Sequence, residues 1–162
     1  MTEIVYRGEW PDDVKRTVEF FLEPYVDLIP GWCRILYVRF ESIDADSMVS
    51  IRVCYENRWA TMRVSPDWLE ELPDDRSRAL IHEIVHIHVQ PMRTVFVDVT
   101  AGMDEQLKEF AWERFREAWE GATEDLTWAF FSIQADKPSG VGHEDEVRWV
   151  AENSSTIVSE VK

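Results

Sequence analysis

Three residues in the segment LIHEIVHIHVQP (80–91) have types and a spacing suited to a hydrolytic metal centre. His82 and His86 are four residues apart and Glu83 follows the first of them, so the segment contains the pattern H-E-x-x-H. On a helix that turns by about 100° per residue, the two histidines lie about 40° apart on one face, where both imidazoles can bind one tetrahedral ion. Glu83 lies about 100° from His82, from where its carboxylate can take a proton from a water molecule that zinc acidifies.

An ordinary buried helix offers a second interpretation of the same segment. Leu80, Ile84 and Ile87 form a core stripe at i, i+4 and i+7, and the two histidines of the motif can simply be its polar neighbours. The metal site is favoured because the motif falls in a strongly apolar helix that follows a predicted sheet. His88 lies about 200° from His86, so we expect it to have a core or capping role instead of binding the same ion.

A catalytic zinc ion needs a third protein ligand. The longer pattern H-E-x-x-H-x-x-G-x-x-H does not continue here, because residues 91–93 read Pro-Met-Arg, and His143 lies in a polar tail. A carboxylate from the second long helical stretch is therefore the better candidate.

Among these carboxylates we favour Glu124 as the third ligand, with Glu120 as the second choice. Trp128 and Phe131 follow Glu124 at i+4 and i+7, so its side of the helix is also apolar. A carboxylate at the edge of a helix buried on both sides needs a partner, and a metal ion is one. Alternatively, Glu124 is a first-turn acid of a helix that restarts after Gly121.

The elements that must position these residues predict an α+β fold. A helix begins at Pro11 and ends or kinks at Pro24. Three short runs rich in β-branched and aromatic residues, 32–41, 47–56 and 58–65, predict a three-stranded antiparallel sheet.

The second half of the chain is predicted to be mainly helical. The active-site helix extends from about Asp74 to Val89 and is stopped by Pro91, and the run 94–100 reads as a strand or an extended crossover. A long C-terminal helix follows, from about Asp104 to Ile133. We expect one domain over residues 1–135 and a polar tail over 136–162 that is partly mobile or loosely docked.

Composition narrows the choice of partners and compartment. The net charge is −15, from 32 acidic and 17 basic residues, which disfavours direct binding to nucleic acid. The sequence shows neither a signal peptide nor a membrane span. Cys33 and Cys54 lie in apolar runs and read as reduced residues, so a cytoplasmic protein is expected.

The segment LIHEIVHIHVQP, followed about forty residues later by ATEDLTWAFFSI, resembles the small H-E-x-x-H zincins of the glutamate-ligand (gluzincin) type. Similar proteins are the short metallopeptidase-like proteins of phages and prophages and, more distantly, the ImmA/IrrE-type peptidases. The resemblance covers roughly residues 32–133. It implies a minimal zincin-like fold and, for a phage-encoded chain, the host cytoplasm.

The same resemblance assigns roles to individual residues. It implies His82, His86 and Glu124 as zinc ligands and Glu83 as the catalytic base. It also implies that Trp59–Val64 is an edge strand along the cleft, to which an extended substrate adds by backbone hydrogen bonds.

The function that these observations favour is zinc-dependent hydrolysis of a peptide bond in a narrow protein target, since a small chain has little room for a deep specificity pocket. Tyr55, His88 and Arg93 are candidates to stabilise the oxyanion, and the spacing selects none of them. An alternative is a catalytically silent, zinc-stabilised acidic binding module that sequesters a basic regulatory protein. In a third interpretation the motif is accidental and the histidines only pack.

Overall fold

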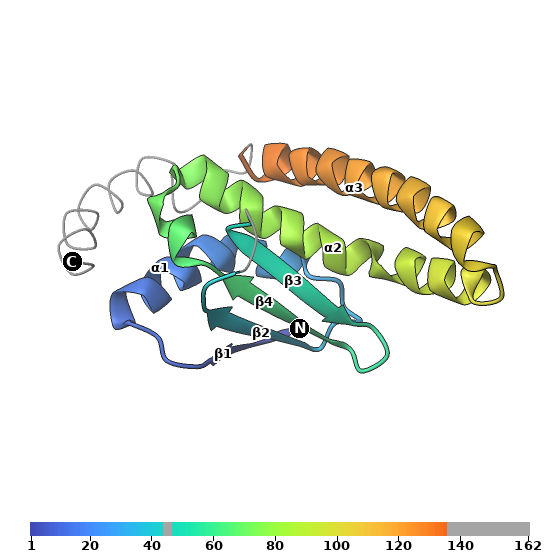
Figure 1. Ribbon diagram of the computed structural model, residues 1–162. Helices are drawn as coiled ribbons and strands as arrows, with labels where there is room; N and C mark the ends of the chain where they lie inside the picture. The colour runs from blue at the N-terminus through green and yellow to red at the C-terminus, as the bar shows by residue number, and fades with distance from the viewer. Residues whose placement is uncertain (44–46, 136–162) are drawn as a thin grey trace.

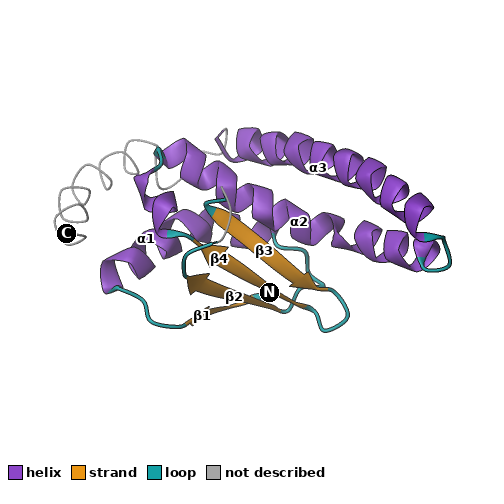
Figure 2. Ribbon diagram, in the orientation of Figure 1, coloured by secondary structure: helices purple, strands orange, loops and turns teal. Residues whose placement is uncertain are grey.

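The computed structural model describes residues 1–43 and 47–135, so the predicted tail at 136–162 lies outside the described residues. The elements are, in chain order, β1 (Glu3–Arg7), α1 (Asp12–Leu22), the 3-10 helix η1 (Glu23–Leu28), β2 (Ile35–Phe40), β3 (Val49–Cys54), β4 (Trp59–Val64), the 3-10 helix η2 (Pro66–Glu70), α2 (Pro73–Thr100) and α3 (Glu105–Ala135). The predicted α+β class is confirmed. Figure 2 shows the sheet with α2 running along it and α3 lying against α2.

The sheet is four-stranded and mixed, so the predicted three-stranded antiparallel sheet is wrong. The strand order is β1-β2-β4-β3, with β1 parallel to β2 and β2 parallel to β4. Only β3 and β4, joined by a short turn with Arg58 at a φ of 58°, form an antiparallel hairpin. Strand β3 lies at the edge of the sheet and is separated from β2 by β4, so β2 and β3 do not form a hairpin.

The strand order also corrects the predicted edge position of Trp59–Val64. This segment is β4 and lies between β2 and β3, with Ala60, Met62 and Val64 fully buried. Its alternating apolar residues are those of a central strand. The edge strand beside α2 is β3.

Helix α2 continues through Pro91 to Thr100, so the predicted stop at Pro91 and the strand or crossover at 94–100 are wrong. The apolar alternation that suggested a strand comes from residues that the helix leaves exposed: Val95, Val97 and Val99. Phe96, by contrast, stacks on Phe115 of α3 at 4.3 Å between ring centroids. Packing against α3 thus stabilises the part of α2 that follows Pro91. It outweighs the tendency of a proline to end a helix.

Helix α3 confirms the predicted C-terminal helix, and Gly121 lies inside it without a break. In Figure 1, α2 and α3 run antiparallel as a long hairpin that projects past the sheet. Side chains one turn apart on α3 therefore meet side chains one turn apart on α2.

The hydrophobic core lies between the sheet, α1 and α2, and it fixes the rotation of α2 about its own axis. The predicted stripe Leu80, Ile84 and Ile87 is fully buried in this core. Because that face is held by the sheet, His82 and His86 are directed to the flank of α2 that meets α3. Within residues 1–43 and 47–135, no helix combines the length and the apolar character that crossing a membrane requires.

Candidate metal centre

His82 and His86 face each other with the geometry of two ligands on one ion. Their Nε2 atoms are 3.2 Å apart and their rings are edge to face, with centroids separated by 4.8 Å. Nitrogen ligands placed 2.0–2.1 Å from a tetrahedral zinc ion lie about 3.3 Å from each other. The imidazole pair is therefore already at the spacing that a shared ion needs.

A carboxylate from α3 completes the group. One Glu120 oxygen, Oε2, lies 3.6 Å from His86 Nε2 and 3.9 Å from His82 Nε2. One ligand atom from each of the three residues fits within 4.8 Å of the others. Two imidazoles and one carboxylate are a donor set of catalytic zinc sites, so the residues present fit this metal.

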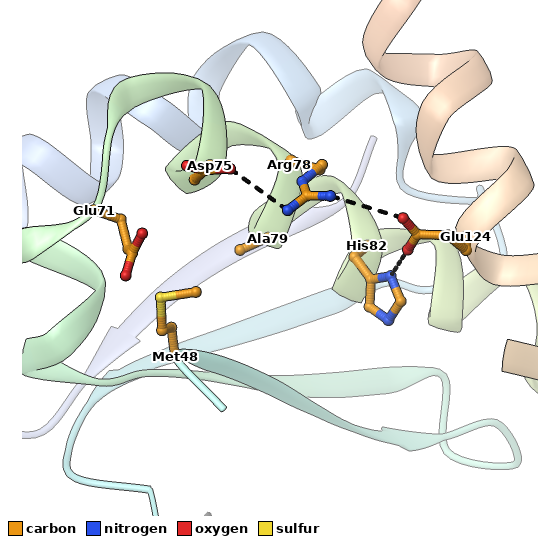
Figure 3. A pocket seen from close by; sticks show the side chains of 7 residues that line it. All are labelled: Met48, Glu71, Asp75, Arg78, Ala79, His82 and Glu124. Carbon is orange, nitrogen blue, oxygen red and sulfur yellow. Dashed lines mark hydrogen bonds and ion pairs between the residues drawn. The ribbon is translucent and has the colours of Figure 1, made fainter. Parts of the chain in front are cut away.

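Glu124, the carboxylate that the sequence favoured as third ligand, lies on the other side of the His82 ring. Its Oε2 is 3.4 Å from His82 Nδ1, and its Oε1 is 3.8 Å from the guanidinium of Arg78, which also contacts Asp75 at 3.5 Å (Figure 3). An acceptor at Nδ1 favours the tautomer with its proton there, which leaves the Nε2 lone pair free to bind a metal. The structure thus brings both glutamates to His82: Glu120 lies near its Nε2 atom and Glu124 near its Nδ1 atom.

Glu83 lies in the same cavity as His86 and Glu120. Burial raises the pKa of its carboxyl to about 8; the charge of Glu120 adds to the rise and a hydrogen bond with the backbone of Ile51 opposes it. With this pKa the carboxyl holds its proton at pH 7; a zinc ion bound beside it would lower the pKa and favour the carboxylate that a general base needs.

His86 is held in its neutral form. Burial, followed by the charges of His82 and Arg93, lowers the pKa of its imidazole to about 4. The ring packs against Trp119 at 4.8 Å, and its buried Nδ1 has no hydrogen-bond partner among the described residues. The neutral imidazole is the form that binds metals.

Two cavities open on either side of the histidine pair. The first, of about 390 Å³, contains His82 and is shown in Figure 3; it is lined by Met48, Glu71, Asp75, Arg78, Ala79, His82 and Glu124. The second, of about 380 Å³, is lined by Ser50, Ile51, Arg52, Val53, Glu83, His86, Gln90, Arg93, Trp119 and Glu120. Edge strand β3 forms one wall of the second cavity, a role that the sequence had assigned to Trp59–Val64.

Of the three candidates to stabilise an oxyanion, Arg93 is the one that lines a cavity with Glu83. Tyr55 packs against Trp32 at 4.8 Å, and His88 contacts the carbonyl of Leu28, so His88 stands outside the centre as expected.

The sequence did not indicate that β3 forms a wall of the second cavity or that Trp119 packs against His86. It ranked Glu120 second as a metal ligand. A signal for Glu120 was present, because it stands four residues before Glu124, the same spacing as His82 and His86. Two i, i+4 pairs on antiparallel helices can meet as a group of four side chains.

A scan against protein-family models and searches of curated proteins and of solved structures found no match. The activity of the chain must therefore be inferred from its own residues and their geometry.

Proposed function

We propose that the chain is a zinc-dependent metallopeptidase of the glutamate-ligand type, in which His82, His86 and Glu120 hold the metal. The observation that carries this proposal is that three ligand atoms of the right types lie within 4.8 Å of one another, beside an acidic side chain in the same cavity. Held by these residues, a zinc ion would supply the polarisation of the peptide carbonyl and the lowered pKa of water that hydrolysis needs.

The remaining chemistry belongs to side chains of this protein. Glu83 accepts the proton of the attacking water and returns it to the leaving nitrogen. Glu124 contacts His82 Nδ1 at 3.4 Å and orients that ring. Arg93, from the same cavity wall as Glu83, is the candidate to stabilise negative charge on the carbonyl oxygen.

The substrate is an extended segment of a protein or peptide. Strand β3 pairs with β4 on one side, and residues 50–53 of β3 line the second cavity. A peptide can add to this edge by backbone hydrogen bonds and cross the centre with its scissile bond next to Glu83. The cavities, of about 390 and 380 Å³, are small, which favours a narrow protein target over general digestion. The two free cysteines are in keeping with a cytoplasmic site of action.

The decisive experiment combines metal content with hydrolysis. Elemental mass spectrometry of untagged protein, purified without added metal or chelator, should find about one zinc per chain, because residues 1–43 and 47–135 contain one such group of ligands. The His82→Ala variant should lose this zinc. The Glu83→Gln variant should keep the zinc but no longer cleave a library of peptides that the wild-type protein cleaves. Protein that is folded without zinc and gains no stability from added zinc would contradict the proposal.

The net charge of −15 favours one rival, a metal-stabilised binding module that sequesters a basic regulatory protein. The same Glu83→Gln variant separates the two functions. A binding module keeps its effect on the partner when Glu83 is replaced, whereas a peptidase loses it.

A further inference from the structure

The two cavities on either side of the histidine pair differ in charge. The first cavity contains three carboxylates, those of Glu71, Asp75 and Glu124, against the single guanidinium of Arg78. The second contains the guanidinium groups of Arg52 and Arg93, and its two carboxylates, Glu83 and Glu120, belong to the proposed centre. A ligand that crosses the centre therefore meets a cationic end and an anionic end.

The cationic end packs against aromatic rings and has charge available for a ligand. The guanidinium of Arg93 lies over the faces of Trp112 and Trp119, at 5.4 and 5.7 Å from the ring centroids. Among residues 1–43 and 47–135, Arg93 forms no ion pair, although acidic residues outnumber basic ones by 32 to 17. An arginine that packs on two indoles and forms no ion pair is placed to receive an acidic group from outside.

The anionic end has unneutralised charge as well. Asp75 and Glu124 share one guanidinium, that of Arg78, at 3.5 and 3.8 Å. Glu71 lines the same cavity; its charge also acts on the guanidinium of Arg76, but within the described part of the chain no cation lies within ion-pair distance of its carboxylate. Three carboxylates against one cation leave a net negative charge that can receive a basic group.

The direction of a bound peptide follows from the strand that it joins. Strand β3 and helix α2 run the same way in Figure 1. The first cavity is lined by Met48, just before β3, and the second by residues 50–53 within β3, so both elements run from the first cavity to the second. Antiparallel pairing is the more stable arrangement per residue. A peptide antiparallel to β3 places its amino side in the second cavity and its carboxyl side in the first.

We propose that the cleft selects extended peptides that carry acidic residues on the amino side of the cleaved bond and basic residues on the carboxyl side. This specificity rests on the proposed peptidase function. In the opposite order each charged end of the peptide meets like charge, so the two orders should differ about tenfold in affinity. Salt screens such contacts, so the difference should shrink as ionic strength rises.

The test uses two fluorescent peptides of identical composition and opposite order, one with three acidic residues before a short neutral segment and three basic residues after it, the other reversed. Binding to Glu83→Gln protein, as purified, is measured by fluorescence anisotropy, and cleavage by wild-type protein is followed by mass spectrometry.

The acidic-first peptide should bind about tenfold more tightly at low salt. Arg93→Gln should reduce this preference to less than about threefold, and so should Glu71→Gln, which leaves the Trp112 and Trp119 contacts intact. Arg116→Gln, an exposed arginine outside both cavities, is the matched control and should leave the preference unchanged.

The outcomes separate this inference from the function on which it rests. Equal affinity for the two peptides, or tighter binding of the basic-first peptide, would overturn the proposed specificity even if both peptides were cleaved. Absence of cleavage of both peptides and of the peptide library would contradict the peptidase function, and the anisotropy would still decide whether the cleft prefers one charge order.

Discussion

Glu120 and Glu124, one turn apart on α3, approach opposite nitrogens of the same imidazole. Glu120 Oε2 is 3.9 Å from His82 Nε2, and Glu124 Oε2 is 3.4 Å from His82 Nδ1. Since the Nε2 atom also faces His86, the two carboxylates cannot have the same role: Glu120 is placed where a metal ion could be shared with the histidines, and Glu124 is placed to orient the ring.

The two glutamates should therefore differ in their effect on zinc affinity. Glu120→Gln removes a proposed ligand and should lower the affinity by more than about 100-fold, whereas Glu124→Gln removes an orienting contact and should lower it by about 10- to 100-fold. Competition with a chromophoric chelator measures both. Glu117→Gln, which alters an exposed carboxylate paired with Arg114 at 2.9 Å, is the control. A larger loss in Glu124→Gln than in Glu120→Gln would return the ligand role to Glu124.

The continuity of α2 through Pro91 can be tested by removing the proline. Inside a helix, proline lacks the donor for the carbonyl four residues earlier, here that of Ile87, and its ring crowds that carbonyl. Pro91→Ala should therefore raise the free energy of unfolding by about 1–3 kcal/mol, measured by urea denaturation, and leave zinc content unchanged. Pro24→Ala, at the start of a 3-10 helix where proline is tolerated, should not give a comparable gain. An unchanged or lower stability in Pro91→Ala would indicate that the helix ends at this residue.

The local part of the centre could be predicted because it depends on helical periodicity alone. The i, i+4 spacing of His82 and His86 fixes their common face, and the apolar stripe beside them fixes which side of α2 enters the core. The choice between Glu120 and Glu124 depends on how α3 is rotated against α2. That rotation is set by contacts such as Phe96 on Phe115, between residues distant in sequence.

The sheet was predicted less well because pairing partners are not encoded locally. The alternation in 35–40 and 59–64 identifies two strands, but it does not say that they pair in parallel or that β4 inserts between β2 and β3. The short run Glu3–Arg7, which became β1, is only partly buried and its apolar signal is weak. Long-range pairing thus decided which strand borders the cleft.

The two cysteines should differ sharply in reactivity. Burial raises the pKa of the Cys33 thiol to about 11, and hydrogen bonds with the backbone of Ile35 and Ala60 only partly offset this rise. Because the thiolate is the nucleophile, a thiol whose pKa is raised to about 11 is only about one part in a thousand ionised at pH 8. Iodoacetamide should therefore label Cys54 in the native protein, where Cys54 is partly exposed, and reach Cys33 only after unfolding in urea. In Cys54→Ser the native protein should remain unlabelled; labelling of Cys33 at the rate of Cys54 would contradict its buried position.

Zinc should stabilise the fold, because its proposed ligands come from two helices that the unfolded chain does not hold together. An ion present at about 100 times its dissociation constant adds about 2.7 kcal/mol when it binds the folded state alone. For a chain of this size that corresponds to a rise in Tm of about 5–10 °C, measured by calorimetry after chelation and again after zinc is restored. His82→Ala and Glu120→Gln should each remove most of the rise, whereas Glu83→Gln should keep it, since Glu83 is not a ligand. An equal rise in His82→Ala would place the stabilising ion elsewhere in the protein, and the histidines of α2 would then be polar neighbours of the core.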